Sequence, residues 1–409
     1  MSLYGHPVSD VAQLMRTVGG SDLDLDQIGE GFARAAWSGI AEPGDRFAGL
    51  LVHTLGPRGA LDAVLADTAV RNVVARLIEA GVEEGQLGDV RGAVSRFTPR
   101  LATALSLLPL QQAIRFGARL LVPGGPGWPE GLDDLGLHAP VALWCRGTDD
   151  ALAALGSSIA LVGARAATGY GEHVTMEAAA GLVDRGYAIV SGAAYGIDGM
   201  AHRAALASQG QTVAILAGGV DRFYPSGHDA LLTRIVEKGA VLSELPCGQP
   251  PTKWRFLQRN RLISAVSSAT VVIEAGWRSG SLNTAGHAAA LGRPLGAVPG
   301  PVTSAASAGC HRLIREFDAV CVTSAEEMAE LAPLDATRMA ASGKNDRQSP
   351  DLTRLLDALS ARSPRSTDDV AARSGLAVSA VQAMLGTLEL EGVVRQRERG
   401  WVRTSNELN

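Results

Sequence analysis

One short stretch constrains the fold of this chain more than any other. The run Ile159-Ala-Leu-Val-Gly-Ala-Arg165 is apolar until it ends in Gly-x-Arg, and Gly169-Tyr-Gly171 then opens a helical pattern. An apolar strand that runs through a glycine turn into a helix is typical of a nucleotide-binding α/β unit. Glycine allows a phosphate to approach backbone N–H groups at a helix N-terminus, and Arg165 can add a positive charge. The alternative is that the glycines only tighten a turn.

Similar glycine turns recur after other apolar runs. Ser191-Gly192, Gly218-Gly219 and Ser279-Gly-Ser281 each follow such a run. The alternation of short apolar runs with helical patterns predicts a doubly wound, mostly parallel α/β sheet, whose strand ends share one ligand-binding crevice. The predicted strands are 141–145, 159–162, 188–190, 212–216, 240–243, 270–274, 295–298 and 319–322, and the helical patterns include 198–208, 230–237 and 282–291.

The flanking regions predict two smaller units. Residues 26–107 carry helical patterns, broken at Leu55-Gly-Pro-Arg-Gly-Ala60, which resembles the turn of a SAM-like or helix-hairpin-helix unit. The imperfect glycine pattern favours a plain helical packing domain. The proline-rich stretch from Leu120 to Pro129 predicts an irregular link between domains.

The C-terminal region predicts three helices and a hairpin turning at Gly400, which is the outline of a winged helix. Acids and bases balance in this unit, so a protein-contact or packing role is at least as well supported as DNA binding. The predicted domains are 1–110 (helical), 111–334 (α/β), 335–350 (linker) and 351–409 (winged helix).

The charge and cysteine content narrow the classes of function. The net charge of −5 excludes a globally basic nucleic-acid-binding protein, so any anion site must be a local patch. The four cysteines, Cys145, Cys247, Cys310 and Cys321, show no metal-ligand spacing and predict reduced thiols in a cytosolic protein without a metal. We find no secretory signal pattern and no apolar run long enough to span a membrane.

The most informative cluster outside the glycine turns is Lys253-Trp-Arg-Phe-Leu-Gln-Arg-Asn-Arg261. Cations interleaved with aromatic rings suit single-stranded nucleic acid, because the cations follow phosphates and the rings stack on bases. The alternative is a solvated basic helix start with two core aromatics. The apolar pair Leu262-Ile263 indicates that part of the motif is buried, with Asn260 bonded to loop backbone.

Several other polar residues allow a catalytic reading. Asp198 and His202 lie one helical turn apart and predict either an acid–base pair or an acid that pairs with a packed histidine. Since no Ser or Cys lies in a nucleophile-elbow context, we favour the structural reading. Glu244 and Glu274 end strands, and we expect them to orient neighbouring arginines rather than to catalyse.

Taken together, these residues resemble one known family, the DNA-processing protein A family, DprA, also called Smf. The resemblance runs from about residue 120 to residue 322 and depends on the order and spacing of its motifs. The motifs are Val162-Gly-Ala-Arg165, Ser191-Gly192, Gly196-Ile-Asp198, Ala201-His202, Tyr224-Pro225, Ser243-Glu-Leu-Pro246, Arg259-Asn-Arg261, Glu274-Ala275, Ser279-Gly-Ser-Leu282, Thr284-Ala285 and Pro299-Gly300. The family's usual Phe-Pro before Arg-Asn-Arg is Leu257-Gln258 here, and its usual Leu-Ile-Thr-Ala is Leu282-Asn-Thr-Ala285.

The resemblance implies a cytosolic, dimeric, non-catalytic protein with an extended Rossmann-like domain and no cofactor. Members of the family bind single-stranded DNA during natural transformation and help to load the RecA recombinase. By position, the resemblance implies DNA contacts at Arg165, Lys253 and Phe256. The further residues that we expect at the DNA site are Gly163, Ser191, Gly192, Arg259, Asn260, Arg261, Ser279 and Gly280.

The competing hypothesis is an enzyme that acts on nucleotides, such as a phosphoribohydrolase of the lysine-decarboxylase-like group, which has a similar core. Such enzymes resemble one another in a Pro-Gly-Gly-x-Gly-Thr-x-x-Glu loop. This chain has Glu274-Ala-Gly-Trp-Arg-Ser-Gly-Ser281 at that point, and this counts against the enzyme.

Overall fold

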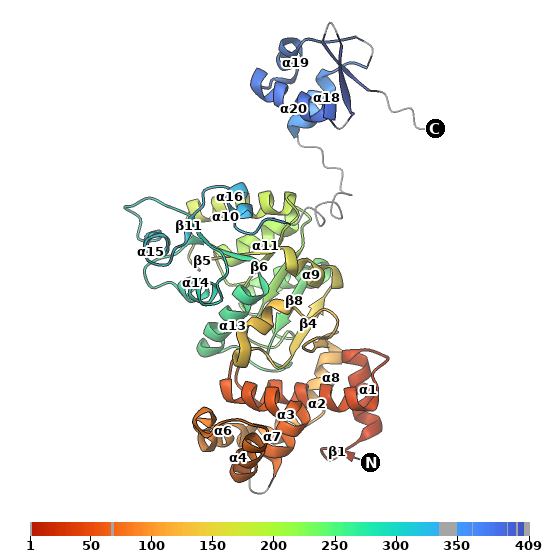
Figure 1. Ribbon diagram of the computed structural model, residues 1–409, viewed down its shortest axis with the longest axis vertical. Helices are drawn as coiled ribbons and strands as arrows, with labels where there is room; N and C mark the ends of the chain where they lie inside the picture. Colours follow the sequence, from red (N-terminus) through yellow and green to blue (C-terminus); the bar gives the residue numbers. More distant parts are fainter. Residues whose placement is uncertain are drawn as a thin grey trace. The chain divides into compact units, whose positions relative to one another are not determined.

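The computed structural model describes residues 2–66, 69–334, 350–361, 363–390, 392–397 and 400–404. The chain divides into two compact units, Met1–Leu334 and Asp335–Asn409 (Figure 1). Residues 335–349, which make up nearly all of the predicted linker, lie outside the described residues.

The first unit is built on one nine-stranded sheet with the order β11-β10-β9-β5-β6-β7-β8-β4-β3. Every neighbouring pair is parallel except β4–β8 and β3–β4, which are antiparallel. The strands are β3 (Arg119–Leu121), β4 (Leu143–Gly147), β5 (Ser158–Gly163), β6 (Ala188–Ser191), β7 (Thr212–Ile215), β8 (Ala240–Ser243), β9 (Ala269–Glu274), β10 (Leu295–Ala297) and β11 (Val320–Cys321). The predicted mostly parallel sheet is thus confirmed, whereas the irregular link expected from Leu120 onward begins as an edge strand.

The strand order reverses beside β5. The chain adds β6, β7 and β8 on one side of β5 and then returns to add β9 and β10 on the other. Such a reversal opens a crevice at the carboxyl ends of the two central strands, and this is the ligand position in doubly wound sheets. The topology rule therefore places the crevice beyond Gly163 and Glu274, the last residues of β5 and β9.

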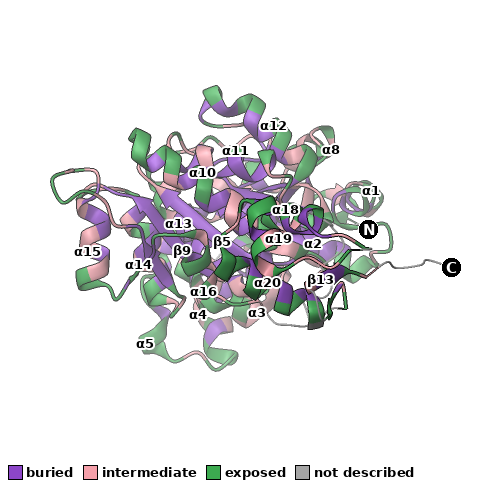
Figure 2. Cartoon of the chain, turned by 90° about the horizontal axis from the view of Figure 1, so that it is seen from above, coloured by how far each residue is buried: buried purple, intermediate pink, exposed green. Residues whose placement is uncertain are grey.

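Helices cover both faces of this sheet because side chains alternate along each buried strand. Ile159 and Leu161 of β5 pack with helices α10, α11 and α16, whereas Ala160 and Val162 pack with α13, α14 and α15. Figure 2 shows the central strands as buried and the outward sides of the helices as exposed. The covering helices are α9 (Asp149–Ala153), α10 (Gly169–Asp184), α11 (Ile197–Ala207), α12 (Asp229–Lys238), α13 (Lys253–Val266), α14 (Ser281–Ala290), α15 (Ala308–Glu316) and α16 (Ala325–Glu330).

The N-terminal region is helical, as expected, after a short hairpin of β1 (Ser2–Leu3) and β2 (His6–Pro7). Its longest helix kinks at Gly56, within the predicted break. Helices α1, α2 and α8 share one apolar cluster with β3, β4, β7 and β8, and Trp144 Nε1 donates a 3.1 Å hydrogen bond to Ser38 Oγ. The helices are α1 (Val8–Gly19), α2 (Leu25–Ile40), α3 (Arg46–Leu65), α4 (Ala69–Glu79), α5 (Glu84–Leu87), α6 (Val90–Phe97), α7 (Leu101–Ala104) and α8 (Leu108–Arg115).

The second unit has its own small core. It comprises α18 (Pro350–Ala358), α19 (Thr367–Ser374), α20 (Val378–Leu390) and the antiparallel pair β12 (Val394–Arg397) and β13 (Gly400–Arg403). Leu355, Val370, Leu385 and Trp401 are buried together in it. Three helices followed by a hairpin match the predicted winged-helix outline. In neither unit do the described residues contain a helix long and apolar enough to cross a membrane.

Candidate nucleic-acid interface

The structure brings Arg165, the arginine of the first glycine turn, against the basic cluster 253–261, which forms the start of α13. Arg165 is exposed just beyond β5, and its guanidinium carbon Cζ lies 5.1 Å from the ring centroid of Phe256 in α13. Lys253 is exposed at the first position of α13, three residues before Phe256, and residues at that spacing lie on the same side of a helix. Arg165, Lys253 and Phe256 are therefore gathered at one place, although the sequence separates them by about ninety residues.

Arg259 lies beneath this group rather than on the surface. It is buried, and its Nη1 donates to the backbone oxygens of Gly192, at 2.7 Å, and of Ile215. Burial lowers the pKa of the Arg259 guanidinium to about 10, against the opposing attraction of Asp198, so the group stays charged at neutral pH. A Cβ at position 192 would fall on this guanidinium, so glycine at 192 lets Arg259 take this position.

Asp198 and His202 do not pair. The carboxylate of Asp198 accepts the N–H groups of Gly192 (3.2 Å) and Ala194 (3.4 Å). Burial raises the pKa of Asp198, and the charge of Arg259 and these N–H groups oppose that rise. The Nδ1 atom of His202 lies 2.7 Å from the Thr212 hydroxyl, and burial lowers the pKa of His202 to about 3. The expected acid–histidine pair is therefore wrong, and His202 is a neutral packed histidine.

The remaining residues of the Arg-Asn-Arg motif also make contacts within the protein. Arg261 forms a 2.7 Å ion pair with Glu244 and donates to the backbone oxygen of His138 at 3.0 Å. Asn260 Nδ2 donates to the Gly280 oxygen at 3.4 Å. The predictions that Glu244 orients an arginine and that Asn260 bonds loop backbone are confirmed.

Glu274 orients the loop that carries Arg165 instead of orienting an arginine. Its buried carboxylate accepts the N–H of Thr168 at 2.8 Å and the hydroxyl of Thr168 at 2.6 Å. Thr168 in turn caps α10 by accepting the N–H of Gly171 at 3.2 Å. A Cβ at Gly171 would fall on the Glu274 carboxylate, so this glycine permits the contact. The expected arginine partner of Glu274 is therefore wrong.

The serines of the predicted site differ in exposure. Ser191 is fully buried and donates its hydroxyl to the Leu161 oxygen at 2.6 Å. Ser279 is partly exposed, with its Oγ 2.7 Å from Ser281 Oγ, and Gly280 is exposed at the start of α14. Gly163, Ser279 and Gly280 thus offer accessible groups, whereas the hydroxyl of Ser191 supports β5 from within.

Two family models match this chain, and their ranges overlap at residues 324–333. The model described as DNA recombination-mediator protein A matches residues 119–333, and the model of the DprA winged helix domain matches residues 324–398. The chain belongs to the DprA family.

Members of this family from several bacteria are similar to the chain over most of its length. The DNA processing protein DprA of Mycobacterium tuberculosis is 41% identical over 383 residues, covering 90% of this chain and 93% of that protein. Protein Smf of Escherichia coli is 37% identical over 271 residues, covering 64% of this chain and 72% of that protein. The crystal structure of DprA from Streptococcus pneumoniae superposes with a TM-score of 0.58 at 28% identity, covering 74% of this chain and 97% of that chain.

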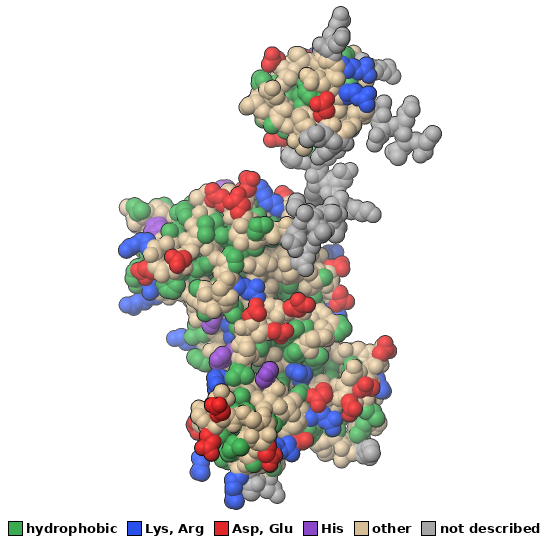
Figure 3. Space-filling view, in the orientation of Figure 1, with side chains coloured by type: hydrophobic (Ala, Val, Ile, Leu, Met, Phe, Trp, Pro, Cys, Tyr) green, Lys and Arg blue, Asp and Glu red, His purple; other side chains and the backbone are tan. Residues whose placement is uncertain are grey.

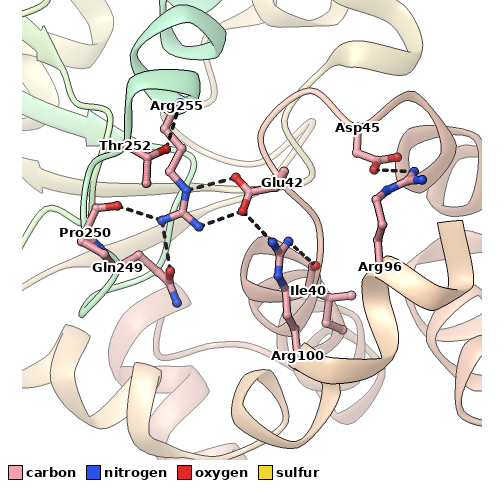
Figure 4. Close-up of polar contacts among 9 residues, drawn as sticks. All are labelled: Ile40, Glu42, Asp45, Arg96, Arg100, Gln249, Pro250, Thr252 and Arg255. Atoms are coloured by element: carbon pink, nitrogen blue, oxygen red, sulfur yellow. Dashed lines mark hydrogen bonds and ion pairs between the residues drawn. The ribbon is translucent and has the colours of Figure 1, made fainter. Parts of the chain in front are cut away.

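Arg255 does not face the crevice side with Lys253, although its place in the basic cluster of this DprA-family chain predicts a phosphate contact. It is turned toward the N-terminal helices, where its Nε and Nη2 donate to the two carboxylate oxygens of Glu42 at 3.0 and 2.9 Å (Figure 4). Glu42 also accepts from Arg100 at 2.8 Å, and Arg255 Nη1 donates to Gln249 Oε1 and the Pro250 oxygen. Arg255 therefore ties α13 to the helical region.

The sequence analysis missed two residues at this site. Glu42 has no signal in the sequence, because its partner Arg255 is 213 positions away. Tyr224 was noted only as part of the Tyr-Pro motif, yet its ring centroid lies 5.5 Å from that of Phe256, with the planes tilted by 54°.

The face of the protein in Figure 3 is not uniformly basic. Over the face in Figure 3, Lys and Arg side chains are scattered among Asp and Glu side chains. This mixture agrees with the net charge of −5 and restricts anion binding to local groups such as Arg165 and Lys253.

Proposed function

We propose that this protein binds single-stranded DNA in the crevice beyond β5 and β9, and that it acts as a recombination mediator that helps to load RecA rather than as an enzyme. The observation that carries the proposal is the position of Arg165 over Phe256, on the turn of α13 that begins with Lys253. Two exposed cations beside aromatic rings at a topological switch point suit a flexible anionic polymer with accessible bases.

Membership of the DprA family supports a DNA ligand, and the site favours an unpaired strand. Phosphate contacts by Arg165 and Lys253 are independent of sequence, and aromatic rings accept any base once it is unstacked. In a duplex the base faces are already stacked, so the rings would gain nothing from it. Transfer to RecA and action as a homodimer are part of the proposal by family resemblance.

The residues of the proposed site divide into two groups. We assign direct contact with the strand to the exposed side chains of Arg165 and Lys253, to the exposed Gly280, and to the partly exposed Gly163 and Ser279. We assign a supporting role to the buried residues, whose polar groups already bond within the protein; these are Ser191, Gly192, Arg259, Asn260 and Arg261.

The alternative of a nucleotide-cleaving enzyme gains no support from the described residues. The carboxylate that ends β9, Glu274, is buried and held by Thr168. An assay for release of free base from nucleoside monophosphates tests this alternative, and we expect no product above background.

The proposal is tested by fluorescence anisotropy with labelled single-stranded and duplex oligonucleotides of the same sequence at two salt concentrations. We expect tighter binding of the single strand and a steep loss of affinity as salt rises, because bound cations displace counterions. Equal affinity for both forms, or binding that does not depend on salt, would overturn the proposal.

A further inference from the structure

The Phe256 ring is already surrounded on several sides. Arg165 Cζ lies 5.1 Å from its centroid, Arg259 Cζ lies 5.8 Å from it, and the Tyr224 ring packs at 5.5 Å. Arg259 is itself fixed to the backbone of Gly192 and Ile215. The half-buried Phe256 ring therefore contacts two guanidinium groups and a second ring. It supports these neighbours and leaves little of its own face open to a nucleobase.

Tyr224, by contrast, is 49% exposed. It lies in the loop after β7, and this loop is tied down on both sides of the ring. Asp221 accepts the N–H of Gly248 at 2.9 Å, and the oxygen of Pro225 accepts the N–H of His228 at 2.9 Å. The backbone therefore presents the tyrosine ring in a fixed position beside Phe256, with half of its surface open to solvent.

We propose that Tyr224 is the ring on which a nucleobase of the bound strand stacks, and that Phe256 acts as its support. This inference rests on the proposed function. Arg165 contacts the same Phe256 ring, so a phosphate held by Arg165 places the attached nucleoside near the Tyr224 face. The site then binds one nucleotide, with its phosphate at Arg165 and its base stacked on Tyr224.

Trp254 is a weaker candidate although it is 56% exposed. It lines a groove of about 680 Å³ together with Gln258, Arg96 and Arg100. Those two arginines are already paired with Asp45 and Glu42, so the groove offers no free cation to hold the phosphate of a stacked nucleotide (Figure 4).

The test separates the contribution of the bases to binding affinity from that of the phosphates. The affinity of the full-length protein is measured for an oligothymidylate and for an abasic oligonucleotide of the same length, and the ratio of the two affinities reports base stacking. We expect the wild-type protein to favour the oligothymidylate by roughly 5- to 150-fold, the range found when stacked aromatic residues are removed. Tyr224→Leu should bring this ratio close to one, whereas Tyr224→Phe should keep it.

Two further variants make the test specific. Tyr195→Leu is the matched control, because Tyr195 is also 49% exposed but packs on His228 instead of Phe256; this variant should keep the wild-type ratio. Arg165→Ala should weaken both oligonucleotides equally. The inference is overturned if Tyr224→Leu, folded by circular dichroism, keeps the wild-type ratio, or if Tyr195→Leu loses it to the same extent. If the wild-type protein binds neither oligonucleotide, the proposed function itself fails, and the inference fails with it.

Discussion

The carboxylate of Glu42 accepts two hydrogen bonds from the guanidinium of Arg255, at 3.0 and 2.9 Å. Glu42 lies between α2 and α3, and Arg255 lies in the first turn of α13, two residues after Lys253. The contact therefore fixes the start of the proposed DNA-binding helix from the N-terminal region.

Replacing Glu42 by Gln should destabilise the protein. The substitution leaves Arg255, 11% exposed, without its anion, and weakens Arg100 as well. We expect a loss of roughly 1–3 kcal/mol in the free energy of unfolding, between the values for exposed and for buried ion pairs. Chemical denaturation measures this loss. Glu316→Gln, which breaks the exposed pair with Arg312, is the control and should change stability by less than about 0.5 kcal/mol; equal effects of the two substitutions would contradict the structural role of Glu42.

The stabilisation by Glu42 should depend on pH. Burial by itself would raise the pKa of Glu42, but hydrogen bonds and attraction from Arg255 and Arg100 outweigh it, so the pKa lies below the ordinary value of 4.5. A carboxyl with a lowered folded-state pKa stabilises fully above its unfolded pKa and loses that contribution as pH falls through the folded value. The stability difference between the wild type and Glu42→Gln should thus be constant above about pH 5.5 and shrink below pH 4.5. A difference that grows as the solution is acidified would contradict this.

Arg165→Ala and Lys253→Ala should each weaken single-stranded DNA binding for every sequence tested. Both cations are exposed, so neither substitution should unfold the protein. Each removes one phosphate contact, and the slope of log affinity against log salt should fall by about one unit. Anisotropy titrations over a salt series measure the slope. Arg234→Ala removes an equal charge from the exposed side of α12 and serves as the control; a slope changed equally by that variant would show a general charge effect.

Arg259→Ala should act on stability before it acts on binding. The substitution leaves the oxygens of Gly192 and Ile215 without a donor and Asp198 without a nearby cation. We expect a loss of roughly 3–5 kcal/mol in the free energy of unfolding, as for other broken buried charge pairs. Thermal and chemical denaturation test this. If the variant kept wild-type stability but lost DNA binding, Arg259 would instead be a direct contact.

The sheet was predictable because its strands are short apolar runs buried on both faces, and 188–190 and 240–243 lie almost where the strands form. The edge strand Arg119–Leu121 was missed because three residues beside a proline-rich loop carry no measurable periodicity. Its identity as a strand depends on antiparallel pairing with β4, a partner some twenty residues further along the chain.

The candidate site was predictable in its position but not in its internal contacts. The topology rule placed the glycine turns, including the turn that ends in Arg165, at one edge of the sheet, and the family resemblance placed Lys253 with them. It gave no information on which cations find a carboxylate within the protein. Arg255 and Lys253 are two cations of the same cluster, yet of these two it is Arg255 that donates to Glu42. Glu274 ends its strand as expected, but its carboxylate accepts a hydrogen bond from the hydroxyl of Thr168. No rule of sequence spacing predicts this contact.

The apolar cluster that joins α1, α2 and α8 to β4 has a consequence for shortened forms of the protein. A chain that began after residue 110 would leave the indole of Trp144 without its hydrogen-bond acceptor Ser38 and without its apolar cover. One side of the sheet would then expose an apolar surface that favours aggregation. Exchange of the N-terminal helices between related genes would thus give a folded protein only where the sheet residues that contact these helices are exchanged with them.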